Sequence, residues 1–194
     1  RLGEETSAGN YLLTVGVSDA GKAAAIGALA LGQKTPVLVL TSKEDRAERL
    51  AEELAVWLGD AIQVLEFPER DVLPYERLAP APDTLRDRLL VLSALRDGRP
   101  AVVVACGLAI AQRTLSPTEA GESLHRLHAG GGLDVEAFLR DLTGMGYAIE
   151  AVVQEPGQAG RRGGIVDVFP PTAELPVRIE LMGSGIESLR LFDP

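Results

Sequence analysis

Apolar and polar positions alternate in two different ways along the chain. In the first half, continuous apolar runs such as residues 36–40 and 101–105 alternate with stretches in which apolar side chains recur every three or four residues. A continuous apolar run is typical of a strand buried on both faces, and the three-to-four spacing is typical of an amphipathic helix. This order of elements predicts a parallel sheet covered by helices.

Two helices are expected between these strands, in addition to an alanine-rich one at residues 23–31 that follows a short strand at residues 11–15. The first begins at a capping signal near Glu44, and its apolar face includes Trp57, which we expect in the core. The second begins at an Asp83 cap and turns four leucines inward, namely Leu85, Leu89, Leu92 and Leu95. Gly59 and Gly98 are expected to end the two helices.

The pattern changes near Pro117. Beyond it, we expect one helix capped by Asp134 and strands at residues 124–128, 147–153, 164–169, 177–182 and 186–192. Strands joined by short turns predict an antiparallel sheet, here with one helix. The sequence therefore predicts an α/β domain over residues 1–118 and a smaller α+β domain with an antiparallel sheet over residues 119–194.

Composition narrows the class of protein. The chain has 194 residues and a net charge of −9, which disfavours a generic DNA-coating surface. No apolar stretch approaches the ~18–20 residues of a membrane helix, and the single Cys106 excludes an internal disulfide and a cysteine-based zinc site. His125 and His128 are expected to point to opposite faces of a strand and to be solvated, so that they form no metal site. We expect a piece of a longer cytoplasmic protein, with no membrane partner.

Residues 16–23 match the pattern G-x-x-x-x-G-K of a phosphate-binding loop, between a strand and a helix. In such a loop, glycines allow backbone N–H groups to surround phosphate, and a lysine adds a positive charge. After the lysine, such a loop has Ser or Thr, whose hydroxyl ligates magnesium. Here the residue is Ala23, which cannot ligate a metal, and Asp19 adds negative charge where phosphate would lie. The residues that define this degenerate nucleotide loop are Gly16, Gly21, Lys22 and Ala23.

Hydrolysis also needs a carboxylate at the end of a neighbouring strand. The strand at residues 101–105 ends in Cys106-Gly107, and the strand at residues 37–40 ends in Thr41-Ser42, so that neither supplies an acid. We therefore expect no ATP hydrolysis, no catalytic residue, no metal and no bound cofactor. Two alternatives stay open: a P-loop ATPase or helicase fragment whose missing acid lies beyond residue 194, and a direct DNA-binding module.

Alternation along residues 177–182 predicts an exposed basic patch. Val177, Ile179 and Leu181 are expected to pack on the helix, which leaves Arg178, Glu180 and Met182 on the other side. Of three further arginines, Arg161 and Arg162 lead into the expected strand at residues 164–169, and Arg190 lies on the expected strand at residues 186–192. An arginine patch with an apolar neighbour fits an acidic protein partner. The alternative is that these arginines pair locally with Asp167, Glu180 or Glu187.

Residues 161–194 contain the motifs R-G-G-x-x-D-V-F-P, R-I-E and I-E-S-L-R-x-F-D. They resemble the domain shared by the excision-repair protein UvrB and the bacterial transcription-repair coupling factors, and the resemblance extends back to about Tyr11. Ala23 and the short link from Tyr75 to Asp83, which has no room for the aromatic hairpin of UvrB, favour the N-terminal module of the coupling factors. The resemblance implies a RecA-like P-loop domain followed by a domain similar to UvrB domain 2.

The resemblance also implies what such a module does. It recruits UvrA in transcription-coupled nucleotide excision repair and hydrolyses no ATP, while other regions of the longer chain act on DNA and stalled RNA polymerase. Matched residue by residue, the UvrA contacts fall on Arg162, Arg178 and Met182. Met182 stands where the family often has Phe.

Overall fold

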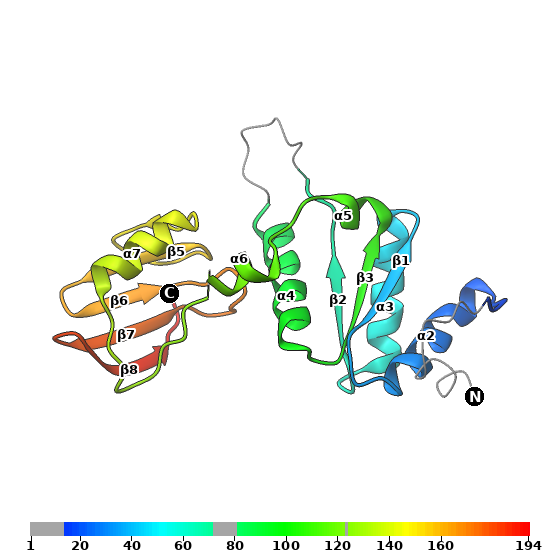
Figure 1. Ribbon diagram of the computed structural model, residues 1–194, viewed down its shortest axis with the longest axis horizontal. Coiled ribbons are helices and arrows are strands. Elements are labelled where there is room, and N and C mark those ends of the chain that lie inside the picture. Colours follow the sequence, from blue (N-terminus) through cyan, green and yellow to red (C-terminus); the bar gives the residue numbers. More distant parts are fainter. Residues whose placement is uncertain (1–13, 72–80, 123) are drawn as a thin grey trace. The chain divides into compact units, whose positions relative to one another are not determined.

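A computed structural model of the chain describes residues 14–71, 81–122 and 124–194 (Figure 1). The chain divides into two compact units, Arg1–Thr114 and Leu115–Pro194. The domain boundary predicted from the sequence is at residue 118, four residues after the end of the first unit at Thr114. Each unit has its own sheet and its own core, and the two are described separately.

The first unit contains three parallel strands in the order β1 (Val37–Thr41), β3 (Ala101–Cys106) and β2 (Gln63–Phe67). All six residues of β3 are buried, as expected for a central strand with apolar side chains on both faces. The predicted parallel sheet is confirmed. β1 is an edge strand, and its Leu38 and Leu40 side chains are 54% and 58% exposed.

Helices cover both faces of this sheet (Figure 1). One face packs on α2 and α3, and the other packs on α4. The helices of the first unit are η1 (Asp19–Gly21), α2 (Lys22–Leu31), α3 (Glu44–Leu58), α4 (Pro82–Asp97) and α5 (Gly107–Ala111). Gly59 and Gly98 end α3 and α4 as expected, and both adopt positive φ angles that favour glycine.

The expected inward faces of α3 and α4 are partly wrong. Trp57 is 63% exposed, whereas its neighbour Leu58 is buried. In α4 the buried side chains are Arg88, Val91 and Ala94. The expected leucines Leu85 and Leu95 are exposed. Arg88 tolerates burial because its guanidinium lies 4.0 Å from the centre of the Phe67 ring and donates a 2.6 Å hydrogen bond to the Pro68 carbonyl.

The expected helix starts also differ. α4 begins at Pro82, after an Ala81 cap, so that Asp83 lies inside the first turn. α3 follows Lys43 and has no side-chain cap, because the Thr41 hydroxyl donates to the Lys43 carbonyl instead. Of the expected strand at residues 11–15, residues 11–13 lie outside the described residues, and residues 14 and 15 are not in a strand. No helix within the described ranges is both long and apolar enough to span a bilayer.

The second unit contains a five-stranded sheet in the order β4-β5-β6-β7-β8, with helices α6 (Pro117–Glu122) and α7 (Val135–Gly144). The strands are β4 (Ala148–Ile149), β5 (Gln158–Arg162), β6 (Ile165–Val168), β7 (Val177–Met182) and β8 (Gly185–Leu191). β4 and β5 run parallel, and the other neighbours are antiparallel. The sheet is therefore mixed, and the predicted purely antiparallel sheet is wrong.

Two of the expected strands also need correction. Residues 124–128 form no strand, and the strand expected at residues 147–153 is reduced to Ala148–Ile149. β5 was not predicted, because its sequence Gln-Ala-Gly-Arg-Arg has no run or alternation of apolar side chains. It pairs with β6 through the two-residue turn Gly163-Gly164, in which Gly163 has a φ of 60°. The R-G-G motif is thus explained by this hairpin.

α7 covers one face of the five-stranded sheet. Its N-terminus is capped as predicted, because an Asp134 carboxylate oxygen accepts from the Ala137 backbone N–H at 3.0 Å. The core between helix and sheet consists of Phe138, Leu142, Ala159, Val166, Val168, Ile179 and Ile186. Because side chains alternate along a strand, the remaining positions point to the face opposite α7.

A backbone crossing closes one side of this opposite face. Gly160 pairs with Asp167, and a Cβ atom at Gly160 would lie 2.3 Å from the Glu150 carbonyl oxygen. Glu150 is itself held by a 2.8 Å hydrogen bond from its N–H to the Ala159 carbonyl, and Val153 nearby is buried. Only glycine fits where the segment at residues 150–153 crosses β5.

Candidate functional site

The face opposite α7 contains most of the charged side chains of the sheet. Register places Asp167 beside Arg178 and Arg178 beside Arg190, so that β6, β7 and β8 each contribute to it. We define the open face as Arg162, Asp167, Arg178, Glu180, Met182, Ser188 and Arg190. The predicted contact residues Arg162, Arg178 and Met182 therefore share one face of the sheet.

Asp167 lies at the centre of the open face. Its side chain is only 7% exposed, and Arg178 approaches it with two parallel hydrogen bonds, from Nε to Oδ1 and from Nη2 to Oδ2, each 2.8 Å long. Arg162 approaches the same carboxylate with Nη2, 3.5 Å from Oδ2. One carboxylate thus pairs with two guanidinium groups, which leaves one positive charge in excess.

Arg178 is also held on its flat side. Its guanidinium carbon lies 4.5 Å from the centre of the Phe192 ring. Its hydrogen bonds to Asp167 raise the pKa of Arg178 above its ordinary value, so that the group stays charged. Arg178 is 27% exposed and Arg162 is 58% exposed. Both side chains therefore remain accessible although they are paired.

The other end of the open face is more apolar. Met182, at the end of β7, is 72% exposed. It lies four residues along the strand from Arg178, or about 13 Å at roughly 3.3 Å per residue. Between them, Glu180 accepts hydrogen bonds from Ser188 and Arg190, and the bond from Ser188 is the main cause that lowers the pKa of Glu180.

Local pairing, the alternative considered for the arginine patch, is therefore observed for three of its members. Arg162 and Arg178 pair with Asp167, and Arg190 pairs with Glu180. Arg161 lies on the opposite face, where its Nη1 is 2.5 Å from Glu136 on α7.

The two histidines match the expectation only in part. His125 is partly buried, because its ring packs edge-on against Phe138 with centroids 5.0 Å apart, and its Nε2 lies 3.8 Å from the Asp141 carboxylate. The His128 side chain contacts the backbone of the next residue, with its Nδ1 3.1 Å from the Ala129 carbonyl oxygen. Both lie outside a strand, so the predicted strand is wrong. Their predicted solvation holds, because His128 is exposed and the His125 side chain keeps 29% of its surface accessible.

The segment predicted to be a degenerate nucleotide loop leads directly into α2. Gly16 is exposed, Gly21 precedes the helix, and Lys22 is its first residue. The Lys22 Nζ lies 2.5 Å from Asp19 Oδ1, and this hydrogen bond lowers the pKa of Asp19 below its ordinary value. Ala23, where a magnesium-ligating hydroxyl would stand, is 1% exposed and packs in the core. The lysine charge is thus already paired within the loop.

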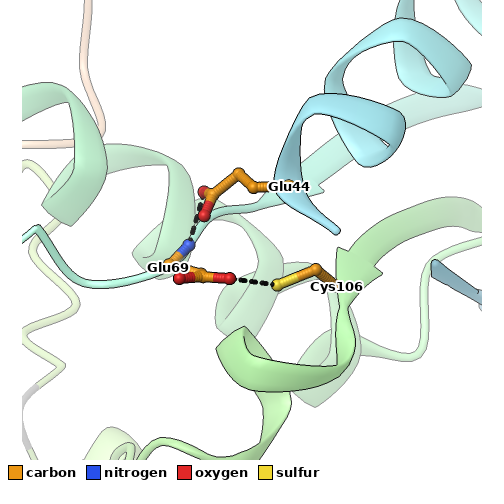
Figure 2. Close-up of side chains that lie close together, drawn as sticks. All are labelled: Glu44, Glu69 and Cys106. Carbon is orange, nitrogen blue, oxygen red and sulfur yellow. Dashed lines mark hydrogen bonds between the residues drawn. The ribbon is translucent and has the colours of Figure 1, made fainter. Parts of the chain in front are cut away.

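A cluster of acids and sulfur lies where the strands of the first unit end. Figure 2 shows Glu44 at the start of α3, Glu69 after β2 and Cys106 at the end of β3. Their possible ligand atoms all lie within 4.8 Å of one another. The Cys106 thiol donates a 2.7 Å hydrogen bond to Glu69, and Glu44 accepts a 2.7 Å bond from the Glu69 N–H. Sequence reasoning examined only residues directly after the strands and so missed these acids.

This cluster has the donor atoms of a cation site but is closed by its own hydrogen bonds. Burial, followed by the hydrogen bond to Glu69, raises the pKa of the Cys106 thiol, and the thiolate is the form that binds metal. Burial is also the main cause that raises the pKa of Glu44. We therefore assign no metal to it. Cys106 is buried, as predicted, and caps α5 by accepting from the Ala109 N–H.

Comparison with known proteins relates both halves of the chain to DNA-repair proteins. Residues 126–194 match the family of the UvrB interaction domain. Nearly the whole chain is similar to proteins named transcription-repair-coupling factor. The match is 30% identical for Myxococcus xanthus, over 98% of this chain and 16% of that protein. It is 32% identical for Staphylococcus aureus USA300 and 31% identical for Bacillus subtilis 168, each over 93% of this chain and 15% of the relative.

The chain thus spans about one sixth of the length of these relatives. The matches confirm the resemblance that the motifs of residues 161–194 indicate, including its extension back through the first unit. The chain is therefore a member of the transcription-repair-coupling factor family over most of its length and contains a UvrB interaction domain at residues 126–194.

Proposed function

We propose that the second unit recruits UvrA through its open face, as part of a cytoplasmic factor that couples transcription to nucleotide excision repair. The observation behind this proposal is the arrangement of Arg162 and Arg178 around one buried carboxylate, with exposed Met182 on the same face. Two guanidinium groups with one counter-charge favour an acidic partner, and an exposed methionine offers it an apolar contact.

The match to the UvrB interaction domain and to the coupling factors supports UvrA as that partner. The open face of this domain combines positive charge with an exposed apolar side chain. RNA polymerase and DNA, in this proposal, bind other regions of the longer protein. The net charge of −9 supports a protein partner for this chain rather than a nucleic acid.

Calorimetric titration of the 194-residue chain with purified UvrA tests the proposal. Combined charge reversal, Arg162→Glu with Arg178→Glu, is expected to weaken binding at least about a hundredfold, because paired interface arginines are typical hot spots. The matched control reverses Arg140 and Arg161, which lie on the α7 side of the same unit and change the net charge equally. If both variants bind UvrA like the wild type, the open face is not the site.

We further propose that the degenerate nucleotide loop does not hydrolyse ATP. The proposal rests on Ala23, whose methyl group ligates no metal, and on the ion pair between Lys22 and Asp19. The competing hypothesis, a P-loop ATPase fragment, predicts magnesium-dependent ATP binding that Lys22→Ala abolishes. Titration of the chain with ATP and magnesium distinguishes the two, because our proposal predicts no binding that depends on Lys22.

A further inference from the structure

We propose that Asp167 is a positioning residue for UvrA recognition: it holds Arg178 and Arg162 in the orientation that the partner requires. This inference rests on the proposed function. Asp167 is negatively charged, whereas a residue that attracts an acidic partner is expected to be positively charged. Its consequence is that removal of a negative charge from a basic binding face weakens the binding of an acidic protein.

The first argument is geometric. The Asp167 carboxylate is held in the sheet, 7% exposed, and both of its oxygens accept from Arg178 at 2.8 Å. Phe192 packs against the flat side of the same guanidinium at 4.5 Å. One edge and one face of the Arg178 head group are therefore fixed before any partner arrives.

The second argument concerns the donors that remain. In the ranges that the structure describes, Arg178 Nη1 and both Nε and Nη1 of Arg162 donate no hydrogen bond to the protein. These donors are available to a carboxylate of the partner. The excess positive charge thus lies on the guanidinium groups of Arg162 and Arg178, whose conformational freedom is already reduced. Binding of a partner therefore costs less side-chain entropy than binding to unpaired arginines would.

Two physical effects predict opposite results for Asp167→Asn. If Asp167 acts only through its charge, the variant gains one unit of positive charge and binds acidic UvrA residues more tightly. If Asp167 acts by positioning, the variant loses half of the two-point acceptor for Arg178, and UvrA binds about tenfold more weakly. The sign of the change therefore distinguishes the two effects.

The experiment is a calorimetric titration of UvrA with the 194-residue chain and its variants, at two salt concentrations. Glu136→Gln is the matched control, since it removes one negative charge from the same unit but lies on α7, outside the open face, where it pairs with Arg161. We expect it to stay within about twofold of the wild type. In an Arg178→Ala background, Asp167→Asn should cost less than about twofold, which a general structural role would not produce.

A second variant keeps the test valid if Asp167→Asn does not fold. Phe192→Leu retains every charge and removes only the ring beneath Arg178, and we expect about threefold weaker binding. Unchanged or tighter binding by folded Asp167→Asn overturns the positioning role while leaving the UvrA proposal intact. If Asp167→Asn does not fold, unchanged binding by Phe192→Leu overturns that role. Failure of the wild-type chain to bind UvrA removes the proposed function itself.

Discussion

Replacement of Gly160 by alanine tests the crossing of the backbone over β5. The added Cβ would lie 2.3 Å from the Glu150 carbonyl oxygen, a distance at which one of the two chains must move. Glu150 cannot shift freely, because its N–H donates a 2.8 Å hydrogen bond to Ala159, next to the substituted residue. Overpacking of this kind costs about 1–3 kcal/mol, and loss of the backbone hydrogen bond adds about 0.5–1.5 kcal/mol.

We therefore expect Gly160→Ala to destabilise the second unit by about 2–4 kcal/mol. Native-state hydrogen exchange of the amides in β6 and β7 measures this, because the slowest amides of a unit report its global unfolding free energy. The matched control is Gly132→Ala, where the nearest atom, the Ser184 carbonyl oxygen, is 3.9 Å from the new Cβ. We expect the control to change stability by less than about 1 kcal/mol. Equal protection in Gly160→Ala and the wild type would refute the crossing.

Two further predictions concern the first unit. Ala23→Thr restores the loop motif but places a hydroxyl in the core, so we expect a loss of about 1–3 kcal/mol in thermal unfolding and no ATP hydrolysis in a phosphate-release assay. Magnesium-dependent turnover by this variant would contradict the expectation that the neighbouring strands supply no acid for hydrolysis. Burial, and then repulsion from Glu48, raises the pKa of Glu66 above its ordinary 4.5. The folded state thus holds this proton more tightly than the unfolded chain, and stability falls as pH rises above that value. Glu66→Gln should therefore raise the melting temperature at pH 7 and have no effect near pH 4. We expect the free energy of unfolding at pH 7 to rise by less than about 1 kcal/mol. An equal rise in melting temperature at both pH values would contradict the raised pKa of Glu66 as the cause.

Sequence pattern predicted the elements that hydrophobic burial alone determines. The strand at residues 101–105 is continuously apolar and is the buried central strand of its sheet. The alternation at residues 177–182 placed Ile179 in the core and Arg178 and Met182 on the open face. In both strands the burial of apolar side chains dominates, so the sequence alone is enough to predict which side chains face the core.

Elements that depend on distant partners were not predictable in this way. β5 contains two arginines and a glycine, and it is a strand because β6 pairs with it on one side and β4 on the other. Arg88 occupies an inward position in α4 because its guanidinium lies against the Phe67 ring and donates to the Pro68 carbonyl, contacts that come from the end of β2. The sequence offered Asp167 as one of three candidate partners for the arginines, and the register of β6 and β7 identified it as the counter-ion that Arg162 and Arg178 share.

The edge strand β1 has a practical consequence for work on the isolated chain. Its two outward leucines, Leu38 and Leu40, stand on a strand that has a single neighbour, β3, among the residues that the structure describes. Unprotected edges with apolar side chains are where separate molecules add to one another's sheets and aggregate. The substitution Leu38→Lys would protect this edge during purification.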